Sequence, residues 1–184
     1  MNKLLIISFV LLGFFCGYAQ ESADMKEDFP KNEFRINALN LLLFKSFDVT
    51  YERVINDESS YGINTMFSLE GESRFSSDDY IYYYEGFTLT PYYRLYFGKK
   101  PNSGFFGEAF MIFSSGKYDY YESNYEYGFK DFTEFGIGLS IGTKLVTRRN
   151  FVANIHGGIA RNFLDSKYGP GAAPRVGISF GWRY

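Results

Sequence analysis

The chain has 184 residues, a formal net charge of −2 and 21% aromatic residues, including 17 tyrosines and 21 phenylalanines. The length suits one domain, and the nearly balanced charge without a basic cluster argues against a nucleic-acid partner. A single histidine and a single cysteine argue against a transition-metal site. We therefore expect one domain that binds neither a cofactor nor nucleic acid.

Residues 1–19 have the three-part layout of a secretory signal peptide. Lys3 supplies the positive start, Leu4–Phe15 form a short apolar core, and Gly17-Tyr18-Ala19 form a small-x-small cleavage site. The apolar core is too short to span a bilayer comfortably. We therefore expect the chain to be exported and cleaved after Ala19.

Cleavage at this site leaves a mature chain without cysteine. Residues 20–32 then form a charged periplasmic lead-in, and residues 33–184 form the folded domain. The competing interpretation is a lipoprotein acylated at Cys16. Phe15 argues against it, because a lipoprotein signal needs a small side chain just before the cysteine.

Eight segments in which apolar and polar residues alternate follow the leader. A strand turns successive side chains to opposite faces, so this period predicts β-strands. In the sixth segment Leu139 and Ile141 lie on an apolar face and Ser140 on a small, polar one. Pro91 interrupts the fourth, and we expect a bulge there because proline cannot donate to a ladder. The predicted strands are Phe34–Leu42, Phe47–Val54, Tyr61–Glu70, Phe87–Phe97, Phe105–Ser114, Phe132–Val146, Phe151–Asn162 and Pro174–Tyr184.

The connections between these strands alternate in length. The short ones are Ile55–Ser60, Gly98–Gly104 and Thr147–Asn150. The long ones are Gly71–Gly86, Ser115–Asp131 and Phe163–Ala173. Short periplasmic turns and long outer loops are typical of bacterial outer-membrane barrels. The sequence therefore predicts an all-β fold, an eight-stranded antiparallel up-and-down transmembrane β-barrel.

Four segments resemble the small eight-stranded OmpA/OmpX-type barrels and, more narrowly, an uncharacterised family of compact outer-membrane barrels of unknown function. They are Asn32-Glu33-Phe34-Arg35-Ile36-Asn37, Val49-Thr50-Tyr51-Glu52-Arg53, Thr90-Pro91-Tyr92-Tyr93-Arg94 and Gly181-Trp182-Arg183-Tyr184. The resemblance implies an outer-membrane location in a Gram-negative cell, with membrane lipids as surroundings. It also implies that Phe180, Trp182 and the terminal Tyr184 are the signal read by the barrel-assembly machinery. It implies no catalytic residues.

Charged residues recur on the polar face that an eight-stranded barrel turns inward. We expect them near the periplasmic end, with Glu52 paired to Arg35 or Arg183. Buried charges need such partners, because an unpaired one costs several kcal/mol. One interpretation is an inert plug and the other is a gate whose pairs exchange to open a narrow pore. The full set is Arg35, Glu52, Arg94, Glu108, Lys144 and Arg183, with Glu108 expected to pair with Arg94 or Lys144.

His156 is the only histidine and falls on the inward face of the seventh strand. Outer-membrane lipid hydrolases use a barrel histidine with a serine two residues further on. Here that position is Gly158, and no serine is placed to be activated. We therefore expect a hydrogen-bonded lumenal histidine and no enzyme.

Two predicted outer loops are rich in tyrosine and acid. Tyrosine offers rigid, amphipathic contact area, so these loops could bind an extracellular protein or glycan. The competing interpretation is that the strands continue above the membrane and carry these tyrosines as an aromatic girdle. The tyrosines are Tyr80, Tyr82, Tyr83, Tyr84, Tyr118, Tyr120, Tyr121, Tyr125 and Tyr127.

These features are compatible with three alternative functions. The first is a non-enzymatic outer-membrane barrel with a structural, adhesive or surface-binding role. The second is an outer-membrane enzyme acting on lipid. The third is a soluble lipocalin-like barrel that holds a small ligand, in which the apolar face would point inward. The glycine-rich polar face favours the membrane barrel, because small residues fit a crowded lumen.

Overall fold

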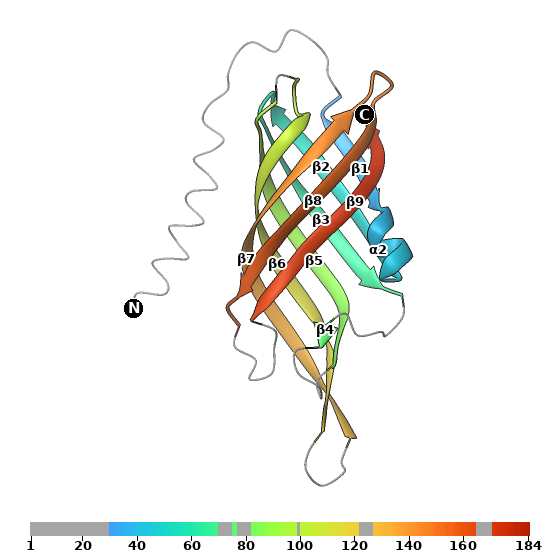
Figure 1. The fold of residues 1–184 in the computed structure, drawn as a ribbon, viewed down its shortest axis with the longest axis vertical. Helices are drawn as coiled ribbons and strands as arrows, with labels where there is room; N and C mark the ends of the chain where they lie inside the picture. Colours follow the sequence, from blue (N-terminus) through green and yellow to red (C-terminus); the bar gives the residue numbers. More distant parts are fainter. Residues whose placement is uncertain (1–29, 70–74, 77–81, 99, 122–126, 165–170) are drawn as a thin grey trace, which may run out of the picture.

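The computed structural model describes residues 30–69, 75–76, 82–98, 100–121, 127–164 and 171–184, and these fold into a closed antiparallel β-barrel (Figure 1). Except at β4, strands adjacent in the chain pair with each other, and β1 pairs with β9. Strand β3 pairs with β5, while the two-residue β4 adds only to β5. The strands are β1 (Asn32–Asn37), β2 (Ser46–Asn56), β3 (Ser59–Ser68), β4 (Phe75–Ser76), β5 (Tyr82–Tyr96), β6 (Gly104–Tyr121), β7 (Tyr127–Val146), β8 (Phe151–Asn162) and β9 (Ala172–Arg183). Apart from β4, these are the eight strands of the predicted up-and-down barrel, which is confirmed.

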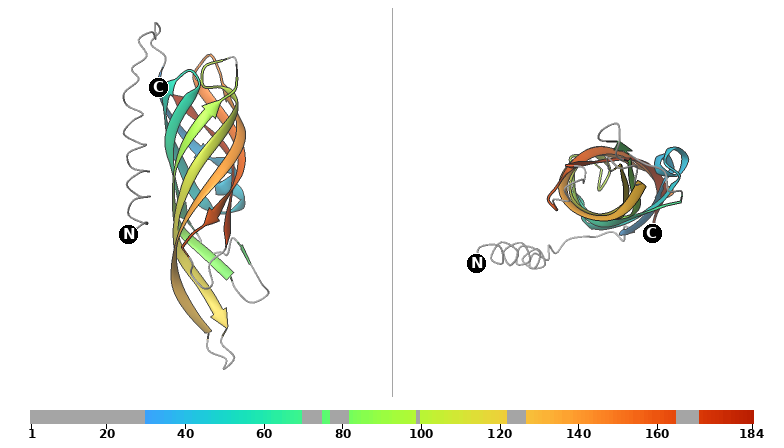
Figure 2. Two further views of the ribbon diagram at one scale, coloured as in Figure 1. Left: turned by 90° about the vertical axis from the view of Figure 1, so that its left-hand side faces the viewer. Right: turned by 90° about the horizontal axis from the view of Figure 1, so that it is seen from below.

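The alternation of side chains decides which face of each strand is inside. In β7, Leu139 and Ile141 are 70% and 62% exposed, whereas Ser140 between them is 3% exposed. Strand β2 alternates in the same way, with Asp48, Thr50 and Glu52 buried. The barrel is therefore apolar outside, and its interior holds most of the polar and charged side chains together with aromatic rings. Figure 2 shows the ring of strands end-on.

Glycines in β7 let aromatic rings fill the narrow interior. An added Cβ at Gly138 would lie 2.5 Å from the ring of Phe110, and one at Gly142 would lie 2.5 Å from the ring of Phe106. Real Cβ atoms do not approach other atoms so closely. The small face of β7 therefore makes room for the rings that β6 turns inward.

Replacing Gly142 with alanine should lower the free energy of unfolding by about 1–3 kcal/mol, because the new methyl group overpacks the interior. Gly157→Ala is the matched control, since a Cβ at Gly157 would meet nothing within 4 Å. Urea titration of both variants, folded in detergent, measures the difference. Equal stability of the two variants would contradict the crowding described here.

The first predicted strand, Phe34–Leu42, is wrong in its second half. Strand β1 ends at Asn37, and residues Ala38–Leu43 form helix α2. The Asn37 side chain caps this helix by accepting a hydrogen bond from the Asn40 backbone N–H at 3.3 Å. Alanine and leucine favour a helix, and this apolar run lacks the alternation that a strand needs. Among the described residues, no helix is long and apolar enough to cross a membrane.

The bulge predicted at Pro91 is not found. The β5–β6 register is the same on both sides of Pro91, pairing Leu89 with Phe113 and Tyr92 with Phe110. The register shifts instead between Glu85 and Phe87. Proline removes one donor from the ladder but leaves its carbonyl, so the strand keeps its register.

The two longest predicted loops are shorter in the structure. Strand β5 already begins at Tyr82, inside the expected loop Gly71–Gly86. The expected loop Ser115–Asp131 is mostly hairpin, with β6 and β7 paired up to Tyr121 and Tyr127. These strands project beyond the rest of the barrel (Figure 1). High tyrosine content favours strands, which explains why the ladder continues there.

Candidate functional site: the charged lumen and its pocket

Within the described residues, the barrel interior holds a connected network of buried ionic side chains. It lies in the half of the barrel that carries the short turns between β2 and β3, β5 and β6, and β7 and β8. All of its members are at most 9% exposed. They are Glu33 and Arg35 on β1, Glu52 on β2, Arg94 on β5, Glu108 on β6, Lys144 on β7, and Arg175 and Arg183 on β9. We call this set the lumenal ion network.

Glu52 is at the centre of the lumenal ion network. Its Oε2 contacts Arg35 Nη2 at 2.6 Å and Arg94 Nη1 at 3.0 Å. Its Oε1 contacts Lys144 Nζ at 2.7 Å. Three hydroxyl groups also donate to this carboxylate, from Ser60, Tyr92 and Tyr96. One fully buried carboxylate thus joins three cations from three strands.

Glu33 forms ion pairs where β1 meets β9 and the barrel closes. Its carboxylate contacts Arg35 Nη1 at 2.5 Å, Lys144 Nζ at 3.0 Å and Arg183 Nη2 at 2.5 Å. Arg183 Nη2 also donates to the backbone oxygen of Asn102 at 3.1 Å. Strands β1, β7 and β9 and one short turn are therefore tied together through Glu33.

Glu108 extends the network towards the middle of the barrel. Its Oε2 contacts Arg94 Nη2 at 2.5 Å, and its Oε1 pairs with Arg175. Ser140 donates to the same carboxylate at 2.8 Å. The guanidinium of Arg94 also lies 3.8 Å above the centre of the Phe106 ring. Cations over aromatic faces gain further stabilisation in a desolvated site.

The six charged residues expected in the lumen all lie in this network. Of the two bases expected for Glu52, Arg35 contacts it, whereas Arg183 contacts Glu33. Of those expected for Glu108, Arg94 contacts it, whereas Lys144 contacts Glu33 and Glu52. Glu33 and Arg175 were not among the residues expected from the sequence. The alternation could have found both, since they share the inward faces of β1 and β9 with Arg35 and Arg183.

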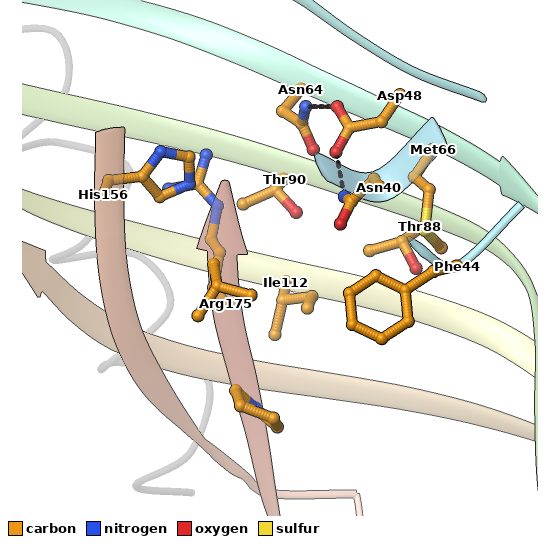
Figure 3. Close-up of a pocket in the computed structure, with 12 residues that line it drawn as sticks. Asn40, Phe44, Asp48, Asn64, Met66, Thr88, Thr90, Ile112, His156 and Arg175 are labelled. Carbon is orange, nitrogen blue, oxygen red and sulfur yellow. Dashed lines mark hydrogen bonds between the residues drawn. The ribbon is translucent and has the colours of Figure 1, made fainter. Parts of the chain in front are cut away.

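A pocket of about 200 Å³ lies inside the barrel beside α2, and Arg175 of the ion network is one of the residues that line it (Figure 3). Asp48 lies on its wall, and its carboxylate accepts hydrogen bonds from the side-chain amides of Asn37, Asn40 and Asn64. Phe44, Met66 and Ile112 add an apolar part to the lining. The pocket therefore joins polar and apolar surface within one lumen.

His156 also lines this pocket. Its Nδ1 lies 3.0 Å from Nδ2 of Asn154, which is in turn 3.3 Å from the hydroxyl of Ser179. Within the described residues no hydroxyl group bonds to the imidazole, so no activated serine is found there. Nor does that part of the chain hold a group of three or more acidic, histidine or cysteine side chains placed to bind a metal ion.

The tyrosines of the predicted outer loops fall largely within strands. Tyr82, Tyr83 and Tyr84 belong to β5, and Tyr127 begins β7. Tyr118, Tyr120 and Tyr121 belong to β6. Tyr80 and Tyr125 lie outside the described residues, as do the predicted signal peptide and most of the lead-in.

The outer surface of the barrel is apolar around its whole circumference. Each of the eight barrel strands exposes large apolar side chains, among them Phe34, Phe47, Ile63, Leu95, Phe113, Leu139, Ile159 and Trp182. Outward charged residues lie near the strand ends, such as Arg53 at the short-turn end and Lys117, Asp131 and Arg161 at the other. Trp182 packs edge-on against Phe151 near the short turns, with ring centres 5.4 Å apart.

Comparison with known proteins gives few matches. No protein-family model and no curated protein sequence matches this chain. Among solved structures, the chain is similar to the crystal structure of the N-terminal β-barrel domain of Pseudomonas aeruginosa OprF. The TM-score is 0.49 and the sequence identity is 11%, with 84% of this chain and 98% of that chain covered.

Proposed function

We propose that this protein is a non-enzymatic β-barrel of the Gram-negative outer membrane, closed to ions by the lumenal ion network. The observation that carries the proposal is the inverted distribution of side chains, apolar outside and ionic inside. A soluble barrel would leave this apolar circumference in water, whereas a bilayer provides a matching surface. Outward aromatic and charged residues near the strand ends suit the two membrane interfaces.

Two alternatives fit the geometry less well. A lipocalin-like barrel needs an apolar interior and a polar exterior, which is the reverse of what is found here. A lipid-modifying enzyme needs an activated nucleophile, and the histidine in the described lumen bonds to an amide instead. The ionic interior is better suited to hold the barrel rigid, because its charges are paired with one another.

Cell fractionation combined with detergent gels tests the membrane location. The protein should fractionate with outer membranes, and heating should change its mobility as the barrel unfolds. Recovery in the soluble periplasmic fraction would contradict the proposal. Conductance in planar bilayers tests the closed lumen. No channel current is expected from the unchanged protein, whereas openings that increase in Glu52→Gln or Glu108→Gln would favour a gate over a plug.

A surface-binding role is the second part of the proposal. The paired β6–β7 hairpin continues beyond the end of β8, where Asn162 pairs with Gly136. This extension would place tyrosine-rich strands outside the membrane, within reach of an extracellular protein or glycan. Replacing residues 118–130 with a short glycine–serine turn should abolish cell adhesion while leaving barrel assembly intact. Unchanged adhesion would remove this part of the proposal.

Replacing Tyr184 with aspartate should impair assembly in cells more than it impairs intrinsic stability. The residue continues the outward aromatic row of Phe180 and Trp182, and its backbone pairs with Asn32 where the barrel closes. Tyr61→Asp, an exposed tyrosine on β3, is the matched control. Outer-membrane levels should fall only for Tyr184→Asp when both variants lose similar stability in urea titrations. Normal levels for Tyr184→Asp would contradict an assembly role.

A further inference from the structure

The barrel wall beside the pocket is not a continuous strand ladder. Strand β1 pairs with β9 only from Ser179 to Arg183, so β9 has no strand neighbour on that side from Ala172 to Ile178. Helix α2 lies there instead and contacts both β9 and β2. Side chains from the two faces of β9 line the same pocket, since Arg175 points inward while Pro174 and Val176 are exposed outside. We call this break in the strand ladder, where α2 lies beside β9, the lateral opening.

We propose that the pocket binds a single-chain amphiphile with an anionic head group, such as a long-chain carboxylate, which enters through the lateral opening. The route rests on the proposed membrane location, because only then does the opening face lipid. Leu42 and Leu43 of α2 are 78% and 70% exposed beside it. An aliphatic chain could therefore pass from the bilayer into the pocket without crossing water.

The described lumen is formally neutral as a whole. Its five buried cations are those of the lumenal ion network, and Asp48 and the inward-facing Glu134 bring its buried carboxylates to five. Net charge therefore does not select the ligand. The preference for an anionic head group rests on the cation that lines the pocket itself, Arg175.

Arg175 is placed to receive that head group. Its guanidinium makes one hydrogen bond within the described residues, from Nη1 to Glu108, so its other N–H groups have no acceptor there. Figure 3 shows the guanidinium inside the pocket near His156 and Thr90. A planar guanidinium binds carboxylates through two parallel N–H bonds, a geometry that lysine lacks. Arg175 can therefore bind a second carboxylate besides Glu108.

The remainder of the lining suits the chain. Phe44, Met66 and Ile112 form the apolar part, and Val176 continues it to the outside. Thr88 also lines the pocket, and its buried hydroxyl has no partner among the described residues. The same cavity thus contains apolar surface and a hydroxyl group without a hydrogen-bond partner among the described residues. An amphiphilic ligand would contact both.

Binding of a fluorescent fatty acid, 11-(dansylamino)undecanoic acid, tests the proposal with the full mature barrel in phosphatidylcholine nanodiscs. We expect saturable binding above that of empty nanodiscs, and displacement by palmitate but not by acetate. Arg175→Gln should weaken binding at least about tenfold, because the charge-assisted hydrogen bonds to the head group are lost. Val176→Trp should do so by obstructing the lateral opening. Arg161→Gln and Ile159→Trp, which change exposed residues of β8, are the matched controls and should bind normally.

The outcomes separate this inference from the proposed function. An inserted, heat-modifiable barrel without saturable binding would overturn the inference and leave the membrane barrel intact. Binding that survives both Arg175→Gln and Val176→Trp would also overturn it, because the probe would then be bound elsewhere. Displacement by acetate as strong as by palmitate would also overturn the inference, because the site would then bind anions whether or not they carry an aliphatic chain. If Arg175→Gln fails to fold, Val176→Trp still decides, since it leaves the ion network unchanged.

Discussion

Replacing Glu52 with glutamine is expected to lower the free energy of unfolding by about 3–5 kcal/mol. Glutamine has nearly the same shape and can still accept hydrogen bonds, but it removes the charge that faces Arg35, Arg94 and Lys144. The five cations of the network would then share its two remaining carboxylates, Glu33 and Glu108. Urea titration of the protein folded in lipid vesicles measures the loss. Glu58→Gln, an exposed acid in a short turn, is the control and should change stability by less than about 0.5 kcal/mol.

Double-mutant cycles test how much of the stabilisation by Glu52 comes from each of its ion pairs. Glu52 and Arg35 contact each other and should show a coupling energy of about 0.5–3 kcal/mol. Glu52 and Arg183 share no contact, because Arg183 binds Glu33, so their coupling should be smaller. Removing both Glu52 and Arg35 with neutral residues of similar size should recover part of the loss. Coupling near zero in both cycles would contradict the network described here, as would a Glu52→Gln variant as stable as Glu58→Gln.

Replacing Leu139 with arginine is expected to lower stability in membranes by about 2–4 kcal/mol, because the side chain lies midway along the outward face of β7. Leu145→Arg on the same face is the matched control. It lies near the short turns, where the proposed membrane interface makes the penalty about 0–1 kcal/mol. Unfolding titrations in vesicles compare the two.

A stability penalty that is large at Leu139 and small at Leu145 would identify a surrounding bilayer, because the cost of an outward arginine depends on its depth in the membrane. Equal losses for Leu139→Arg and Leu145→Arg would indicate an outer surface without a lipid midplane and would contradict the proposed location. Ser140 is unsuitable as the control on the opposite face. It is 3% exposed and donates to Glu108, so an arginine there would be excluded by its size alone.

The alternation of residues was enough to predict the barrel and the faces of its strands. It assigned Leu139 outward and Ser140 inward, because period two is a direct consequence of strand geometry. It placed the charged residues towards the short turns but could not predict which of them contact each other. Which strands face each other at a given level depends on the stagger with which the barrel closes. Arg183 therefore meets Glu33, its direct neighbour across the β1–β9 ladder, rather than Glu52.

The pocket could not be predicted from the sequence, for a different reason. It depends on α2, and the apolar run Leu41–Phe44 has no period from which a helix in a barrel wall could be read. Asn37 was the available signal, since asparagine before alanine and leucine is a typical helix cap. The alternation of β9 indicates that Arg175 points inward. It does not indicate what Arg175 contacts, because that depends on the residues opposite it.

The short β1 strand has a consequence for the order in which the barrel opens and closes. Its two ladders join five residue pairs each, whereas the β6–β7 hairpin joins eighteen. Closing β1 onto β9 also brings together residues 150 positions apart, as between Glu33 and Arg183, which makes it an entropically expensive contact. Backbone amides of β1 should therefore exchange with deuterium before those of β6 and β7. Glu33 and Arg35 both lie on this weakly laddered strand, so the ionic pairs in the lumen fasten the barrel at the place where its hydrogen bonds are fewest.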